Sequence, residues 1–319
     1  MLQTTRSYRG MVTAPHHLAA RAGLNVLSDG GNAVEAMIAA AAAIAVVYPH
    51  MNGMGGDNFW LIHAPGKPVV GIDACGGAAE QADITFYKDQ GCDVIPSRGN
   101  LAALTVAGTV SGGLDAWDDG RDVLGGKLPL GRLLEEAVDY AENGVAVTNT
   151  LAGNTRGKFE ELKDAPGFRD TFLPGGELPE TGARFLQPRI AATLRQLAEA
   201  GLDDFYRGDL ARTIATDLKK DGSPVAISDL ERQEALRVDP LRLKGAGHDV
   251  YNMPPPTQGL ASLLLLGVYE RLKVSQAETF EYVHGLVEAT KRAFRVRDRY
   301  VTDPDYMDVK PESFLAPDE

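Results

Sequence analysis

The segment YPHMNGMGGDNFWLI, residues 48–62, joins two stretches of sequence that call for different secondary structure. An alanine-rich, very apolar run precedes it, and its second half is rich in aromatic and aliphatic residues, as buried β-strands are. Three glycines among the four residues 53–56 allow backbone conformations that a side chain forbids, and they let the chain pass close to a ligand. We interpret this turn as the edge of an active site.

The sequence around this turn predicts helices before it and strands after it. Residues 15–27 and 33–47 have helical spacing of apolar residues; Gly30 and Gly31 end the first helix, and Asn32 caps the second. Residues 58–64 and 68–73 are predicted to be strands. Further along, the pattern predicts helices over 130–143, 189–200, 210–220, 260–272 and 276–300, and strands over 236–243 and 249–251. We see no repeat and no clean linker, so residues 1–319 are predicted to form a single unit.

Composition narrows the class of protein. With 319 residues, 44% of them hydrophobic, the chain can bury a large core. A net charge of -12 disfavours nucleic acid and anionic membranes as partners. Cys75 and Cys92 are too few for a disulfide scaffold, so we expect thiols, with one disulfide as the alternative. Residues 1–10 lack a secretory core and residues 36–47 are too short to span a bilayer, which predicts a cytoplasmic protein.

Several common kinds of site are excluded by spacing. A dinucleotide loop needs a third glycine at position 58, which is Asn58, and a helix after the turn. The six histidines show no metal-ligand spacing, and no Walker A motif or G-x-S-x-G nucleophile elbow occurs. Cys75 follows a predicted strand and precedes two glycines; it is either an exposed nucleophile or, more commonly, a small core residue. The residues alone thus indicate an α/β enzyme without an identifiable nucleophile.

Seven segments along almost the whole chain carry a family resemblance. They are 11–17 with 30–33, 49–59, 101–112 (with Ala107 where proline is usual), 185–188, 205–209, 251–256, and His284, Glu288 and Ala289 with 298–305. In this order they resemble the large subunit of the γ-glutamyltransferase family, which belongs to the N-terminal-nucleophile hydrolases.

The resemblance implies an autoprocessed precursor. Its fold is a four-layer αββα sandwich of the α+β class, completed by a separate small (β) subunit, and this chain would be the large (α) subunit of the heterodimer. The nucleophile would be the first residue of the small subunit, a threonine whose own α-amino group acts as the base. The catalytic residue is therefore expected outside this chain, which would end just before the cut. No metal and no cofactor are implied, and a dimer of heterodimers is an open possibility.

The sequence departs from the γ-glutamyl enzymes at the position that grips the substrate. Those enzymes carry an arginine there for the substrate's α-carboxylate, and here that position is Cys75, which cannot replace two charge-assisted hydrogen bonds. Asp57 and Asn58 stand where the family usually has glycine, and they either reshape the pocket or cap the strand. Gln258 replaces a small residue. Glutathione is therefore predicted to be a poor substrate.

Members of this family without the arginine include cephalosporin-type acylases and oxamate amidohydrolases of purine breakdown. We predict hydrolysis of a small carboxylic-acid amide, with oxamate, cleaved to oxalate and ammonia, as the specific candidate. The alternatives are a γ-glutamyltransferase or glutathione hydrolase with another arginine, an acylase, and an inactive relative that acts as a binding module. The predicted substrate-binding residues are Asn52, Gly55, Gly56, Asp57 and Cys75, with Arg98 as a carboxylate contact or else a surface arginine.

Overall fold

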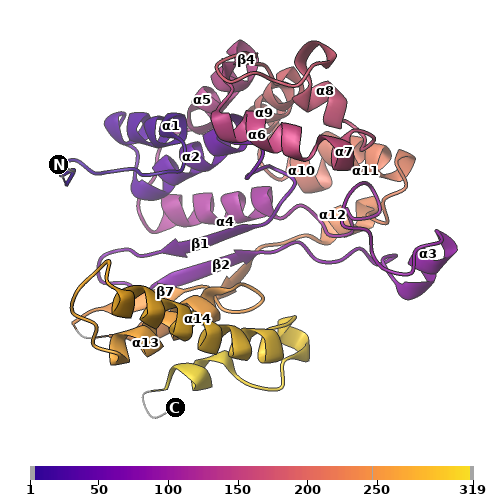
Figure 1. Cartoon of the computed structure of the whole chain (residues 1–319). Helices are drawn as coiled ribbons and strands as arrows, with labels where there is room; N and C mark the ends of the chain where they lie inside the picture. Colours follow the sequence, from indigo (N-terminus) through magenta and orange to yellow (C-terminus); the bar gives the residue numbers. More distant parts are fainter. Residues whose placement is uncertain (1–3, 246, 317–319) are drawn as a thin grey trace. The chain divides into compact units, whose positions relative to one another are not determined.

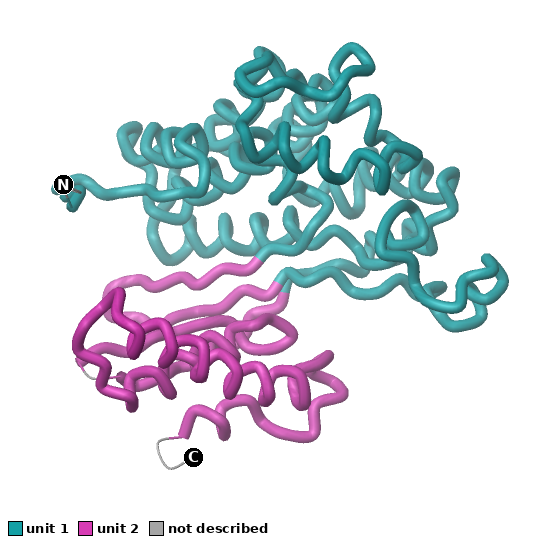
Figure 2. The backbone as a smooth tube through the Cα atoms, viewed as in Figure 1, with its two compact units in different colours: residues 1–58, 74–235 teal, residues 59–73, 236–319 magenta. Residues whose placement is uncertain are grey.

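The computed structural model describes residues 4–245 and 247–316 and divides into two compact units. Unit 1 contains the chain up to residue 58 and residues 74–235, and unit 2 contains residues 59–73 and the chain from residue 236 onward (Figure 2). Each unit is therefore assembled from two separate stretches of sequence. That residues 1–319 form a single unit, the large subunit of an autoprocessed heterodimer, stays a prediction.

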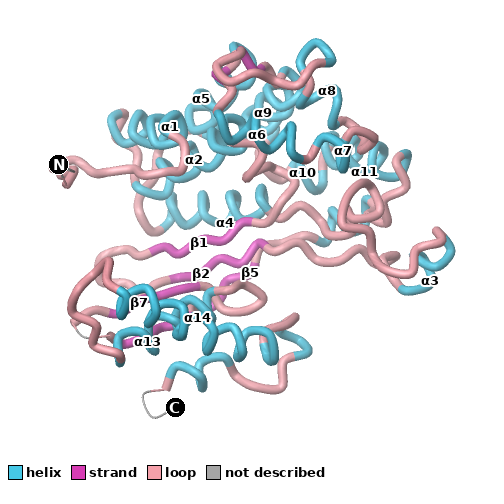
Figure 3. The backbone as a smooth tube through the Cα atoms, in the orientation of Figure 1, coloured by secondary structure: helices cyan, strands magenta, loops and turns pink. Residues whose placement is uncertain are grey.

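Unit 1 is mainly helical (Figure 3). Its described elements are α1 (His17–Ser28), α2 (Ala33–Val47), α3 (Ile84–Asp89), α4 (Thr109–Asp122), α5 (Leu130–Asn143), β3 (Val145–Ala146), α6 (Asn149–Gly157), α7 (Phe159–Leu162), α8 (Phe168–Phe172), η1 (Pro174–Gly176), β4 (Arg184–Phe185), α9 (Pro188–Ala200), α10 (Asp204–Arg207), α11 (Asp209–Lys220) and α12 (Ile227–Arg232). The short strands β3 and β4 pair antiparallel. Among the described residues, no helix is both long and apolar enough to cross a membrane.

Helix α2 is the centre of this unit and confirms the prediction that residues 33–47 form a buried helix. It packs against α1 on one side and α5 on another, and α5 in turn packs against α9 (Figure 1). A capping box starts α2: the Asn32 side chain accepts from the Glu35 amide, and the Glu35 carboxylate accepts from the Asn32 amide. Glu35 is only 1% exposed, and its second oxygen accepts from the amide of Leu128 at 2.8 Å, so its charge is fully hydrogen-bonded.

Helix α4 begins inside the family segment 101–112, and helical spacing did not predict it. It begins at Thr109, its N-cap Gly108 offers no side-chain cap, and it carries Gly112 and Gly113, which are poor helix formers. Packing explains the first of these glycines, because a Cβ at Gly112 would lie 2.8 Å from the Cβ of Ala74 and 3.2 Å from that of Asn58. Tertiary contact therefore outweighs the low helix propensity.

Unit 2 contains the sheet with the most strands among the described residues, a three-stranded sheet of order β1-β2-β5. Its elements are β1 (Asn58–Ile62), β2 (Val70–Ala74), β5 (Leu236–Val238), β6 (Leu241–Lys244), β7 (Asp249–Asn252), α13 (Gly259–Arg271), α14 (Phe280–Tyr300), η2 (Pro304–Tyr306) and η3 (Pro311–Leu315), with the first residue of β1 and the last of β2 assigned to unit 1. β2 and β5 are antiparallel, with Gly71 opposite Val238. Leu241, Leu260 and Leu263 form a core between the β6–β7 hairpin and α13.

The prediction of one strand over residues 236–243 was wrong. Two strands occupy this stretch, separated at Asp239 and Pro240: β5 pairs with β2, and β6 pairs with β7. Pro240 has no N–H for a sheet hydrogen bond, which marks a strand boundary. Element ends also moved: β1 ends at Ile62, and α14 begins at Phe280, where the Thr279 side chain accepts from the Tyr282 amide.

Candidate functional site

The glycine-rich turn is held by the first residue of α4. The backbone N–H of Thr109 donates to the carbonyl of Gly56 at 2.8 Å. The Thr109 hydroxyl lies 3.1, 2.8 and 3.2 Å from the carbonyl oxygens of Gly53, Gly56 and Asp57. A hydroxyl has one proton, so it donates to these carbonyls in alternation or as a shared bond. One side chain thus gathers three carbonyls of the turn onto the start of α4.

Asp57 and the residues around Cys75 come together. The carboxyl Oδ1 of Asp57 accepts from the backbone N–H of Gly76 at 3.0 Å. This contact favours the interpretation that Asp57 shapes the wall of the site, and it places a carboxyl group beside the position where γ-glutamyl enzymes carry arginine. Cys75 itself is half-buried, and neither it nor Cys92 takes part in a disulfide.

The chain after Cys75 runs in close backbone contact with the segment before α4. The N–H of Val106 donates to the carbonyl of Gly77 at 2.9 Å, and Ala78 bridges to Thr105. A Cβ at Gly76 would overlap the Val106 carbonyl, and a Cβ at Gly108 would overlap the Ala74 carbonyl. These two glycines are therefore required by close approach of two backbones.

Tyr206, in α10 (Asp204–Arg207), fixes the start of α4 by hydrogen bonds. Its hydroxyl donates to the carbonyl of Ala107 at 2.7 Å and accepts from the N–H of Ser111 at 2.9 Å. The side chain is 1% exposed, and burial raises the pKa of its phenol, so the hydroxyl remains protonated at neutral pH. The Ser111 hydroxyl donates to the Gly108 carbonyl at 2.8 Å. Sequence reasoning missed Tyr206 and Thr109 as positioning residues, although both lie in segments that carry the family resemblance.

The predicted turn residues are accessible on this chain. Asn52, Gly55, Gly56 and Asp57 are all exposed, and the backbone N–H of Asn52 donates to the carbonyl of Tyr48 at 3.1 Å. The structure thus brings Asp57 to Gly76, next to Cys75, and holds the turn on α4. That these residues bind a substrate stays a prediction.

Arg98 lies in a different part of unit 1. It lines a hollow of about 410 Å³ together with Pro49 and His50 from the start of the turn segment and with Lys158. Its Nε is 3.1 Å from Oε1 of Glu161, and its side chain is 48% exposed. Arg98 therefore shares a surface with the beginning of the segment 48–62 and not with the contact between Asp57 and Gly76. Its role toward a substrate carboxylate stays a prediction.

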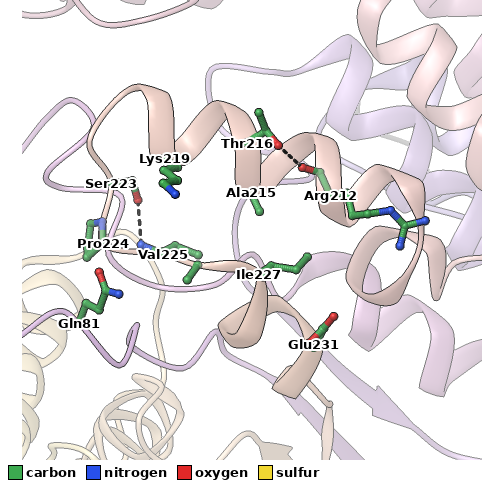
Figure 4. Close-up of a pocket in the computed structure, with 11 residues that line it drawn as sticks. Gln81, Arg212, Ala215, Thr216, Lys219, Ser223, Pro224, Val225, Ile227 and Glu231 are labelled. Carbon is green, nitrogen blue, oxygen red and sulfur yellow. Dashed lines mark hydrogen bonds between the residues drawn. The ribbon is translucent and has the colours of Figure 1, made fainter.

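A second hollow of unit 1, of about 610 Å³, is built from other residues (Figure 4). Its lining comes from Gln81 and from residues of 212–231, whereas the predicted site residues all lie between 52 and 98. Ser223 and Thr216 at this hollow bond to nearby backbone, to the N–H of Val225 and the carbonyl of Arg212. Within 4–245 and 247–316, no cluster of three or more histidine, cysteine, aspartate and glutamate side chains could hold a metal ion.

Comparison with known sequences places this arrangement in a family. Residues 19–319 match the family described as gamma-glutamyltranspeptidase. The chain is 50% identical over 312 residues to the oxamate amidohydrolase proenzyme of Klebsiella pneumoniae, covering 98% of this chain and 59% of that protein. It is 32% identical over 307 residues to the glutathione hydrolase proenzyme of Pseudomonas aeruginosa, covering 94% of this chain and 53% of that protein. The chain thus spans a little over half the length of these relatives.

Solved structures of similar proteins share the fold of this chain. The gamma-glutamyltranspeptidase of Helicobacter pylori superimposes with a TM-score of 0.87 at 28% identity, covering 98% of this chain and 90% of that one. A cephalosporin acylase from Bacillus halodurans superimposes with a TM-score of 0.86 at 33% identity, covering 94% of this chain and 56% of that one. These similarities confirm the predicted N-terminal-nucleophile hydrolase fold class. The sequence match over residues 19–319 and the shared fold show that this chain belongs to the gamma-glutamyltranspeptidase family.

Proposed function

We propose that this chain is the large subunit of an amide hydrolase whose substrate is a small carboxylic-acid amide, specifically oxamate. The observation that carries the proposal is Cys75, with the Asp57 carboxyl group on the neighbouring amide, at the position of the arginine of γ-glutamyl enzymes. The 50% identity to a protein named oxamate amidohydrolase proenzyme supports the same substrate. A small subunit from the same precursor would complete the enzyme.

The reaction is acyl transfer in two steps. The hydroxyl of the small subunit's N-terminal threonine attacks the amide carbon, and its α-amino group takes the proton. Backbone N–H groups stabilise the oxyanion that forms. The C–N bond breaks, ammonia leaves with that proton, and water then hydrolyses the oxalyl ester to release oxalate and restore the threonine. In this scheme the turn 53–57 and Cys75 shape one wall of the pocket.

Electrostatics at position 75 disfavour a γ-glutamyl substrate. A guanidinium there would hold the α-carboxylate by two charge-assisted hydrogen bonds, and losing such a buried contact costs roughly 2–5 kcal/mol. Cys75 offers a thiol, and the neighbouring carboxyl of Asp57 would repel a substrate carboxylate. Oxamate has no such α-amino acid group to anchor. Its own carboxylate would point away from Asp57 and requires a cation from the small subunit, since Arg98 lines a different hollow.

The substrate assignment is tested by two rates on the purified, processed enzyme. We expect ammonia release from oxamate and little p-nitroaniline release from γ-glutamyl-p-nitroanilide. Cys75→Arg should lower the first rate and raise kcat/KM for the second at least about tenfold, since each 1.4 kcal/mol of transition-state binding is a factor of ten. Cys92→Arg, the same substitution elsewhere, should change neither. Efficient turnover of the γ-glutamyl substrate and none of oxamate would overturn the proposal.

Two further outcomes identify the alternatives. The N-terminal residue of the small subunit, read by mass spectrometry, should be threonine; a residue other than threonine or serine would favour a binding module without catalysis. The similarity to a cephalosporin acylase favours a second substrate class. Release of the side chain of a cephalosporin, with oxamate left intact, would assign this chain to that class.

A further inference from the structure

The hollow around His50 has the composition of a small-molecule site. Its volume of about 410 Å³ lies in the range of about 300–1,000 Å³ that ligand pockets occupy. Leu162, Phe168 and Phe172 give it an apolar wall, and the two phenylalanine rings stack with centroids 5.5 Å apart. Arg98 and Lys158 line it as well. Apolar walls with a few polar groups are typical of sites for organic ligands.

His50 lines this hollow and has hydrogen-bonding atoms beneath the surface that are not used. Both ring nitrogens are buried, and neither has a hydrogen-bond partner among the described residues. Buried polar atoms in folded proteins nearly always have a partner, so a ligand in the hollow favours a turn of the ring that brings one nitrogen to it. Burial lowers the pKa of His50, which keeps the ring neutral at pH 7, with one N–H donor and one acceptor.

The charges at the hollow add up to one surplus positive charge. Arg98 is 3.1 Å and Lys158 is 2.7 Å from the carboxylate of Glu161. The hydrogen bond from Lys158, together with the charge of Arg98, holds the pKa of Glu161 below its usual range, so this carboxylate stays ionised. It neutralises one of the two cations. The Nη1 of Arg98 also donates to the Ser97 carbonyl, which leaves further guanidinium donors for a second acceptor.

We propose that the hollow formed by His50, Arg98, Lys158, Phe168 and Phe172 binds an organic monocarboxylate with a flat apolar body. The ring of the ligand lies against the two phenylalanines, and its carboxylate accepts from Arg98. A turn of the His50 ring brings its N–H to the same carboxylate. Lys158 remains paired with the carboxylate of Glu161 when the Arg98 side chain turns to the ligand. One negative charge balances the one surplus positive charge, and the volume suits a ring as well as a carboxylate.

Calorimetric titration of the full-length, processed protein with sodium phenylacetate tests this site without relying on any turnover. We expect saturable binding. Phenylacetamide has the same shape without the charge, and acetate has the charge without the ring, so each should bind at least about tenfold more weakly. No saturable binding of phenylacetate by the folded protein would overturn the proposal, as would equal affinity for phenylacetamide.

Substitutions at lining residues test whether phenylacetate binds in this hollow. Arg98→Gln should weaken phenylacetate about tenfold or more, because it removes the charge-assisted hydrogen bonds. Lys158→Gln should weaken it less, since Glu161 then competes for Arg98. Lys219→Gln removes a cation that lines the other hollow and should leave the affinity unchanged. Circular dichroism checks that each variant is folded. Unchanged affinity in both Arg98→Gln and Lys158→Gln would place the ligand elsewhere and overturn the assignment.

Discussion

The glycine-rich turn 53–57 and the hollow at His50 adjoin in sequence but are built in opposite ways. Backbone groups hold the turn: its carbonyls converge on Thr109, and Gly108 and Gly76 allow two chains to touch. Side chains build the hollow, and many of its polar groups are half-exposed or have no partner in the described structure. The turn is therefore a rigid framework, whereas the hollow has spare bonding capacity for a ligand.

The largest expected effect comes from a substitution that disrupts the close backbone contact between Gly108 and Ala74. Gly108→Ala places a methyl group on the carbonyl of Ala74, so one backbone must move. We expect a loss of at least about 3 kcal/mol in the free energy of unfolding, in the range of severe overpacking. Gly55→Ala meets nothing within 4 Å and should change stability by less than about 1 kcal/mol. Urea unfolding measures both, and equal losses would contradict the rigid framework.

A somewhat smaller effect is expected from Tyr206→Phe. The substitution removes one hydroxyl and leaves the carbonyl of Ala107 and the N–H of Ser111 without their partner in a buried place. Each unsatisfied group costs roughly 1–3 kcal/mol, so we expect a total loss of at least about 2 kcal/mol. Tyr8→Phe changes a fully exposed tyrosine and serves as the control. If urea unfolding gave the same value for both variants, Tyr206 would not support α4.

Thr109→Val removes the clamp on the turn while keeping the shape of the side chain. We expect a loss of about 1–2 kcal/mol in stability, because the hydroxyl is partly solvated. We also expect a lower kcat with oxamate, because the turn would no longer be held. Thr109→Ser keeps the hydroxyl, so its kcat should stay close to that of the unsubstituted enzyme. A Thr109→Ser enzyme as slow as Thr109→Val would show that the methyl group, and not the clamp, matters.

The smallest expected effect is on the pH dependence of the free energy of unfolding, to which His50 at the hollow contributes. Burial lowers the pKa of His50 below the usual 6.5, and burial followed by the charges of His17 and His50 lowers that of His16. The unfolded chain then binds more protons than the folded one below about pH 6.5, so stability falls as pH falls through this region and levels off above it. The slope per histidine stays under about 1.4 kcal/mol per pH unit.

His50→Phe should make this slope shallower, because one titrating ring is removed and the charge on His16 loses a repulsive neighbour. His63→Phe, a change at an exposed histidine, should leave the slope as it is. Urea unfolding at several pH values between about 5 and 7.5, within the range in which histidine changes its charge, measures both. A slope unchanged by His50→Phe would mean that the ring is hydrated in the folded protein.

Much of the helical framework could be predicted from the sequence. The capping box of Asn32 and Glu35 and the apolar run 33–47 act over three or four residues, so the local pattern contains the information. The same holds for the segments that resemble the family. Helix α4 escaped prediction because Gly112 and Gly113 weaken the pattern, and its stability comes from packing on Ala74.

The sequence by itself determined the family, the buried helix α2, the glycine turn and the exchange of an arginine for Cys75. Only the tertiary structure decided that Asp57 meets Gly76, that Thr109 gathers the carbonyls of the turn, and that Arg98 lies with His50 and Phe172. The physical reason is the distance along the chain. Thr109 and Gly56 are 53 residues apart. The local periodicity of a sequence does not say which distant backbone segments come into contact. Such contacts follow from how the whole chain packs.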